Sequence, residues 1–295
     1  MATARCTWTE VSGVDGYNVY LKSNGEFVKQ NSELITDTVY DIENLEDGNY
    51  EAYATSVLND VESESSNVKG FNLVSVATPV IESVSTDQFN GALSSRTLDK
   101  PAGTQEGDLL LLSFGGRRGN PGSNYTMVYP SGWTEIAAIN AGTTASDSVQ
   151  FMAYKIATGD EPTSYTFTTQ MDGSNISLRS TSAILRISGA NSTSPIVSHS
   201  TNSGATGDMV GLSINTTANN LLIFTGVVSE VNATPNIATP IDMVSHWFLI
   251  NGTSGSARTG HRGASKEVGA GATGDIETTR NGANYTCFLV AVGGG

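Results

Sequence analysis

The chain has 295 residues, which is enough to bury a sizeable core and to form two domains. Its 29 acidic and 15 basic residues give a formal net charge of −14, which argues against binding to nucleic-acid phosphates. The lack of both a run of roughly 20 apolar residues and a secretory signal predicts a soluble protein that is neither inserted in a membrane nor exported.

The first 76 residues contain short runs in which apolar and polar residues alternate. Turn-forming sequences such as GVDG, SNG and EDG separate these runs, as expected for strands joined by hairpins. Several short alternating strands with this punctuation predict an all-β sandwich. The strands are expected at residues 5–11, 17–22, 26–30, 38–42, 49–58 and 62–73.

Two stretches of this segment, CTWTEVSGVDGYNVYLK and ENLEDGNYEAYATSVLNDVESESSN, resemble a fibronectin type III domain. The resemblance implies that Trp8 lies on the second strand of that fold and packs under the third. It implies a Tyr-x-Val-Tyr third strand and a Leu followed by Gly-x-Tyr at the entry to the sixth strand. Those positions are Tyr17, Val19, Tyr20, Leu45, Gly48 and Tyr50.

One feature of the resemblance is missing, because the family's first strand has no counterpart ahead of Trp8. Residues 2–9 are therefore expected to form an open sheet edge with unpaired backbone groups. Such an edge is an association hazard or a docking site. We expect another subunit or a neighbouring segment to cover it.

Residues 74–80, VSVATPV, read as a linker between a first domain, residues 1–76, and a second, residues 77–295. The first domain has 13 acidic and 4 basic residues, a net charge of −9, and the second has 16 and 11, a net charge of −5. The second domain is predicted to be a larger two-sheet β-sandwich of the jelly-roll kind. Its strands are expected at residues 108–114, 133–138, 149–157, 164–169, 182–187, 220–228, 243–250 and 285–292.

The second domain carries the sequences KPAGTQEGDLLLL, PSGWTEI, YKIATGDEPTSYTF and SAILRISGA, and later TTANNLLIFTGVV and GAGATGDIETT. These sequences resemble a β-sandwich domain found in bacteriophage virion proteins. The motifs specify turns rather than chemistry. The resemblance implies a chain that is assembled into a virion in the host cytoplasm.

The histidines and cysteines suggest no metal or catalytic site. His199, His246 and His261 show no metal-ligand spacing to one another or to carboxylates. His246 is expected in a half-buried strand, and His261, in a Gly- and Ser-rich stretch, is expected to be solvated. Cys6 and Cys287 are expected to be separate thiols, and we expect no cofactor.

Three acidic residues are candidates by type for the carboxylate pair of a glycosidase: Asp147, Asp160 and Glu161. Asp160 and Glu161 precede a proline, and a solvated acidic turn is the favoured interpretation. Residues 269–274 fit the GxGxxG pattern, but a dinucleotide site needs that pattern between a strand and a helix. A turn-rich loop is therefore expected there.

The loop GGRRGNPG holds the candidate contact residues, Arg117 and Arg118, which could pair with an acidic partner or a sugar acid. The alternative is a flexible hairpin loop with solvated arginines. Tyr125, Tyr129 and Trp133 are candidate exposed aromatics for stacking on sugar rings, although Trp133 in Ser-Gly-Trp is more typical of a core corner.

These observations favour a non-enzymatic bacteriophage structural protein exposed on the particle, as a capsid decoration or head fibre protein or a tail fibre component. Its expected partners are other capsid or tail proteins, further copies of itself, and host surface glycans. Two alternatives remain: a carbohydrate-binding adhesion module and a glycan-degrading β-sandwich enzyme. The absence of a persuasive acid–base pair in the sequence counts against the enzyme.

Overall fold

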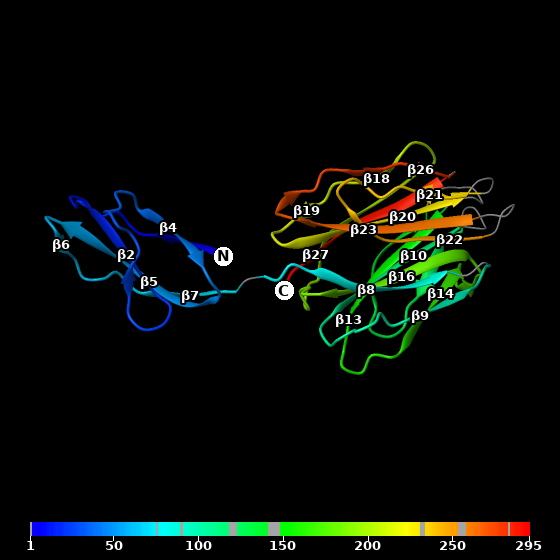
Figure 1. Ribbon diagram of the computed structural model, residues 1–295, viewed down its shortest axis with the longest axis horizontal. Helices are drawn as coiled ribbons and strands as arrows, with labels where there is room; N and C mark the ends of the chain where they lie inside the picture. Colours follow the sequence, from blue (N-terminus) through cyan, green and yellow to red (C-terminus); the bar gives the residue numbers. More distant parts are fainter. Residues whose placement is uncertain are drawn as a thin grey trace. The chain divides into compact units, whose positions relative to one another are not determined.

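In the computed structural model the chain forms two compact units, Met1–Val76 and Ala77–Gly295 (Figure 1). The structure describes residues 2–74, 76–88, 91–117, 123–140, 148–230, 234–252, 258–282 and 284–295. Both units are built from strands within these ranges, which confirms the all-β fold class. The described residues include no helix long and apolar enough to cross a membrane.

The first unit is a small sandwich of two sheets. One sheet pairs β1 (Ala2–Thr7) with β4 (Val39–Leu45). The second sheet is centred on β2 (Gly16–Lys22) and β5 (Gly48–Leu58). It also contains β3 (Val28–Lys29), β6 (Val61–Glu62) and β7 (Lys69–Leu73).

The core of the first unit lies between its sheets and follows the alternation of the sequence. The main buried cluster consists of Val19, Leu21, Ile42, Leu45, Tyr50 and Ala52. Trp8 packs on Tyr17 with ring centroids 5.3 Å apart. The Tyr50 hydroxyl donates to the Glu46 carbonyl at 2.9 Å, which ties the start of β5 to the preceding turn.

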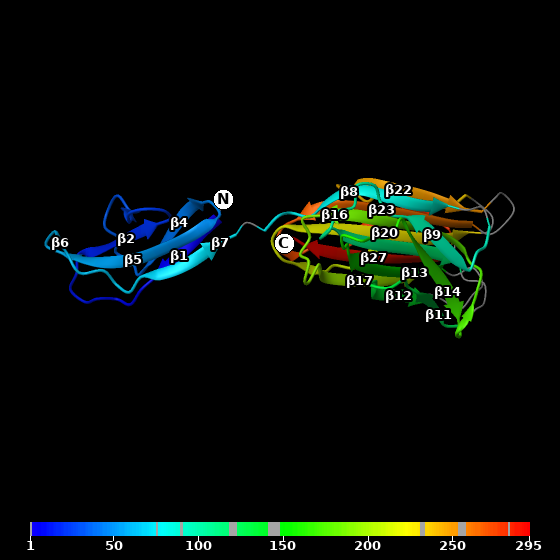
Figure 2. The same ribbon diagram turned by 90° about the horizontal axis from the view of Figure 1, so that it is seen from below.

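The second unit contains two five-stranded antiparallel sheets (Figures 1 and 2). The first has the order β12 (Thr134–Asn140), β13 (Ser148–Ile156), β10 (Leu109–Arg117), β16 (Arg179–Ser188) and β8 (Val80–Gln88). The second has the order β22 (Val244–Asn251), β23 (Arg258–Val268), β20 (Asn220–Glu230), β27 (Asn284–Gly293) and β17 (Ile196–Gly204).

The two sheets pack face to face, and each outer face is covered by shorter strands. Over the first sheet lie β9 (Ser95–Asp99), β11 (Tyr125–Val128), β14 (Ser164–Met171) and β15 (Ser174–Asn175). Over the second lie β18 (Met209–Gly211), β19 (Asn215–Thr216), β21 (Asn236–Ile237), β24 (Gly271–Ala272), β25 (Ile276–Thr278) and β26 (Arg280–Asn281). The strands β10, β20 and β27 are therefore buried on both faces, which explains their nearly continuous apolar sequences.

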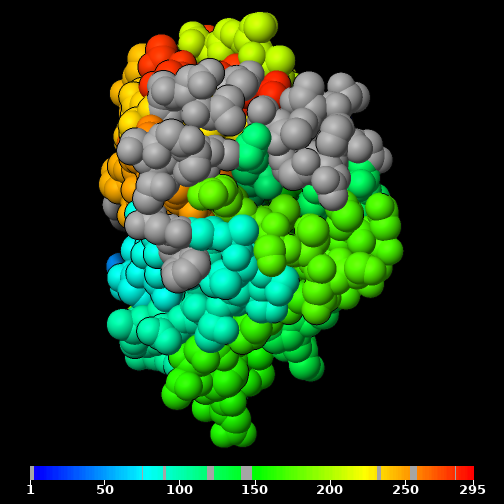
Figure 3. Space-filling model, turned by 90° about the vertical axis from the view of Figure 1, so that its right-hand side faces the viewer, coloured from blue at the N-terminus to red at the C-terminus, as the bar shows by residue number. Residues whose placement is uncertain are grey.

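The jelly-roll detail of the prediction is not confirmed. In a jelly roll, Greek-key connections carry the chain back and forth between two sheets. Here every strand of the first sheet precedes residue 189, and every strand of the second follows residue 195. The space-filling view in Figure 3 shows the same division, with cyan-to-green residues on one side and yellow-to-red residues on the other.

Candidate functional site

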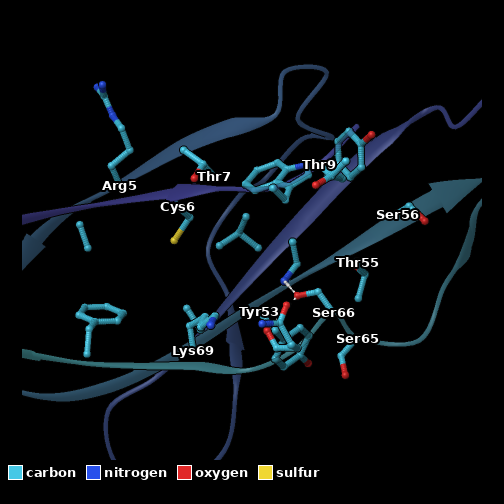
Figure 4. Close-up of a pocket in the computed structure, with 18 of the residues that line it drawn as sticks. Arg5, Cys6, Thr7, Thr9, Tyr53, Thr55, Ser56, Ser65, Ser66 and Lys69 are labelled. Atoms are coloured by element: carbon cyan, nitrogen blue, oxygen red, sulfur yellow. Dashed lines mark hydrogen bonds between the residues drawn. The ribbon is translucent and has the colours of Figure 1, made fainter. Parts of the chain in front are cut away.

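The first unit contains a groove of about 1020 Å³ between β1 and the strands β5 and β7 (Figure 4). Its floor is apolar, with Val19 and Ala52 buried beneath it. Its walls are the inner side of β1 and the segment 63–67, which runs beside β5. The groove therefore follows the gap between the two sheets along the β1 side of the sandwich.

The alternation of β1 decides what faces the groove. Cys6 and Trp8 are half-buried and turn inward, whereas Arg5 and Thr7 are exposed on the opposite face. Figure 4 shows Cys6 pointing into the space and Arg5 pointing away from it. Because the inward side chains are only half covered, the groove exposes apolar surface that a further strand would bury.

The backbone of β1 has one paired edge and one free edge. The amide of Trp8 donates to the Thr38 carbonyl at 3.1 Å, and Cys6 lies opposite Tyr40 in the same ladder. Residues alternate in direction along a strand, so the amides and carbonyls of Arg5 and Thr7 point away from β4. Within the described part of the chain no strand pairs with that edge. The open edge predicted for residues 2–9 is therefore present.

The facing wall uses serine hydroxyls where a regular ladder would use backbone groups. Ser56 donates its amide to the Ser63 hydroxyl at 3.0 Å, and Ala54 donates to the Ser66 hydroxyl at 3.1 Å. The amides of Ser63 and Ser66 return bonds to the carbonyls of Ser56 and Ala54. Ser63 and Ser66 are thus bonded to β5, whereas Arg5 and Thr7 of β1 present backbone groups that no described strand pairs.

The Arg5 and Cys6 side chains of β1 are held in definite states. Arg5 makes a two-point ion pair with Asp41, both bonds 2.7 Å long, on the outer face of β1. Burial, with Asp41 nearby, raises the pKa of the Cys6 thiol, which therefore stays protonated at neutral pH. Among the residues that the structure describes, no group of three His, Cys, Asp or Glu side chains could hold a metal ion.

Of the two candidate arginines, Arg117 ends β10 in the second unit, away from this groove in sequence. Arg117 is half-buried and pairs across the ladder with Arg179 of β16. Burial, and then the charge of Arg179, lowers the pKa of Arg117. Arg118 lies outside the described residues, as does Asp147.

The expectation that Tyr125 and Tyr129 are exposed is wrong. Tyr125 is 1 % exposed because β11 folds over the first sheet, and Tyr129 packs edge-on against Phe167. Trp133 sits against Tyr165 and Phe167, so the interpretation as a core corner is confirmed. None of these rings is positioned to stack on a sugar.

The solvated position expected for His261 is also wrong. His261 lies on β23 between the two sheets, fully buried, with its Nε2 atom 2.9 Å from the Ser113 hydroxyl oxygen. Burial lowers its pKa to about 3, so the ring is neutral. His246 is half-buried on β22, as expected, and His199 is exposed on β17.

The acidic turn is solvated at Asp160 but not at Glu161, whose side chain is only 2 % exposed. Glu161 accepts hydrogen bonds from Lys155 at 2.8 Å, from the Thr158 amide at 2.8 Å and from the Tyr165 hydroxyl at 2.6 Å. Burial alone would raise its pKa, but these donors outweigh burial and lower the pKa to about 2. Glu161 is therefore ionised at neutral pH and fixes the turn to Lys155 and Tyr165, which makes it unsuited to general acid catalysis.

The GxGxxG stretch of residues 269–274 forms β24 and its flanking turns, and no helix follows it. Thr216 of β19 donates to the carbonyls of Gly269 and Gly271, which fixes this loop over the second sheet. The structure therefore agrees with the turn-rich interpretation.

No protein-family model matches this chain, and neither a curated protein nor a solved structure matches it.

Proposed function

We propose that this chain is a non-enzymatic structural protein of a bacteriophage particle, exposed on its surface as a capsid decoration or head fibre protein or as a tail fibre component. The observation that carries the proposal is the groove beside the free edge of β1. The motifs of the second unit that resemble virion proteins support the assignment to a particle.

The groove suits an extended polypeptide from another particle protein. A peptide added beside β1 would bond to the outward amides and carbonyls of Arg5 and Thr7 and lay alternate side chains over the apolar floor. Main-chain bonds supply affinity in such strand addition, and side-chain pockets supply specificity. The first unit is therefore the proposed anchor, and the second unit projects outward.

The second unit suits display on a particle because its scaffold is rigid. Its two central layers are buried on both faces, so binding at its surface requires little reorganisation of the backbone. Contact with host surface glycans would then fall to this outward unit.

The test is the copy number of the chain per purified particle, measured by quantitative mass spectrometry against the major capsid protein. Hundreds of copies indicate a capsid decoration protein, and a small multiple of three or six indicates a tail or fibre component. Absence from particles contradicts the proposal. Deleting residues 1–76 should abolish incorporation, and normal incorporation of the truncated chain would refute the first unit as the anchor.

A further inference from the structure

The two five-stranded sheets of the second unit follow one plan. Reading each from its β12 or β22 edge, the first has the order β12-β13-β10-β16-β8 and the second β22-β23-β20-β27-β17. These strands correspond in chain order as well, since β8, β10, β12, β13 and β16 match β17, β20, β22, β23 and β27 in turn. Strand order and connectivity are thus repeated along the chain.

The irregularities of the sheets are repeated too. The pairing of β12 with β13 shifts register between Glu135 and Ala137, and that of β22 with β23 shifts between Ser245 and Trp247. A second bulge recurs in β8 opposite Ile187 and in β17 after Ile196. Bulges are specific local features, so their recurrence at matching positions is not expected from sandwich architecture alone.

The turns before matching strands use the same contacts. Asp108 ahead of β10 accepts the Gln105 amide at 2.7 Å, and Asn220 at the start of β20 accepts the Thr217 amide at 2.8 Å. The residues just before them, Gly107 and Asn219, both have positive φ.

The corners that lead into β12 and β22 also match. Trp133 donates its amide to Pro130, and Met243 donates its amide to Pro240, at 3.4 and 3.3 Å. The preceding residues, Gly132 and Asp242, have φ of 85° and 60°. Sequence identity between the corners is low, but both share this hydrogen bond and a positive φ at the same position.

The contacts between the sheets are reciprocal. Ser113 on β10 and Thr225 on β20 are matching positions, as are Gln150 on β13 and His261 on β23. Ser113 bonds to His261 at 2.9 Å, and Thr225 bonds to Gln150 at 2.7 Å. Contacts of the form i to j and j to i are the signature of a two-fold interface.

We infer that residues 77–295 are two copies of one structural repeat, divided near residues 189–195, that pack face to face as a dimer within a single chain. Each repeat supplies one five-stranded sheet and the short strands that cover its outer face. The repeats are joined at one end, where Gly295 donates to Gly189 and Asn191 donates to Gly293.

Fusion of the two repeats into one chain explains why two matching positions at the centre of the interface carry different residues. Gly115 and Val227 are matching positions, and a Cβ atom added to Gly115 would collide with the Val227 side chain. In a symmetric dimer the same residue would meet itself there, and two valines would clash while two glycines would leave a void. Two copies in one chain can diverge to one glycine and one valine.

The arrangement of two repeats limits the surfaces by which the second unit can bind other proteins. The face by which one sheet could bind a second copy is already occupied within the chain, and the outer faces are covered. Contacts of the second unit with further copies or other proteins must therefore use its covering strands, strand edges or loops. This consequence does not depend on the proposed function.

The test exchanges the central pair in the full chain and measures the denaturant midpoint of the second unit. Gly115→Val should lower the midpoint by a clash, and Val227→Gly should lower it by leaving a cavity. In the double variant, the valine introduced at position 115 projects from the first sheet into the space that the Val227 side chain filled from the second. The midpoint should therefore recover more than half of the sum of the two single decreases.

The matched control is the next pair along the same strands, Gly116→Val with Val228→Gly. These positions correspond in the repeat, but Gly116 faces Leu178 on one outer face and Val228 lies in the core on the other. Their losses should simply add. The inference is overturned if the Gly115 and Val227 exchange is also additive, or if an experimental structure superposes the two halves only with a shift of strand register.

Discussion

At the scale of single residues, the burial of His261 between the sheets makes the second unit sensitive to acid. The pKa of His261 is about 3 in the folded chain, below the ordinary value of 6.5. Between pH 6.5 and 3 the His261 imidazole is protonated in the unfolded chain but neutral in the folded chain. The free energy of unfolding therefore falls as the pH drops from 6.5 towards 3.

His261→Gln should remove this pH dependence, because a glutamine occupies the matching position, Gln150, and makes the same type of bond. Between pH 7 and 4 the natural chain should lose about 3 kcal/mol more unfolding free energy than the variant. Urea titrations across this range measure the difference. His199→Gln, on an exposed stretch of β17, is the control and should follow the natural curve. Parallel pH profiles for the natural chain and His261→Gln would contradict the prediction.

Glu161 gives a second effect in a lower pH window. Its folded pKa of about 2 lies below the ordinary 4.5, so its stabilisation is present above pH 4.5 and is lost as the pH falls towards 2. Glu161→Gln should cost about 1 to 3 kcal/mol at pH 7, since Lys155 loses its buried partner.

The gap in unfolding free energy between the natural chain and Glu161→Gln should close between pH 4.5 and 2. Asp160→Asn, at the neighbouring exposed position, is the matched control and should change stability little at any pH. Equal changes in unfolding free energy for the two substitutions would show that the bonds of Glu161 do not stabilise the turn.

At the scale of elements, the sequence predicts strands that carry their own apolar pattern and misses those that depend on neighbours. β10, β20 and β27 were all predicted, because their apolar runs need only burial on both faces. β23 was not predicted, because its sequence RTGHRGASKEV has no such run. It lies between β20 and β22, and Gly263 makes room for the ring of Trp247, a fit that only the folded sheet reveals.

One side of the groove in the first unit could be predicted from the sequence, and the other side could not. An open edge was expected at residues 2–9, and β1 pairs only with β4 among the described residues. The sequence did not predict the serine bonds of the facing segment, residues 63–67. The hydroxyls of Ser63 and Ser66 replace backbone bonds of a ladder only once this segment lies beside β5. Burial of Glu161 was likewise hidden, because its partners Lys155 and Tyr165 come from two different strands.

The free edge of β1 can be tested by one substitution. Thr7→Pro removes an amide that points away from β4, so it should leave the β1–β4 ladder intact while blocking addition of a strand. We expect at least a tenfold loss of incorporation into particles with a small change in unfolding free energy. Thr7→Ala, which keeps the amide, is the control.

Hydrogen exchange gives an independent reading of the same edge. The amides of Arg5 and Thr7 should exchange quickly in the isolated chain and slowly in the assembled particle, whereas Cys6 should be protected in both. Rapid exchange at Arg5 and Thr7 in the particle would exclude strand addition at this edge.

At the scale of the whole molecule, the two units have separate cores of very different size, and this difference predicts how the chain unfolds. The first unit has one small core cluster and an open flank, whereas three buried clusters stabilise the second unit. Small domains bury a smaller fraction of their surface and are less stable. Calorimetry of the full chain should therefore resolve two transitions, with the first unit unfolding at the lower temperature.

Trp8 assigns the lower transition, because it is the tryptophan of the first unit and packs on Tyr17. In the full chain, Trp8→Phe should remove most of the fluorescence change from the lower transition and leave the upper one, which Trp133 and Trp247 report, at the same temperature. A peptide that adds to β1 should raise only the lower transition, by mass action on the first unit. A single cooperative transition, or a shift of the upper transition by Trp8→Phe, would mean that the two units are energetically coupled. Binding of a peptide to the first unit would then also change the stability of the second.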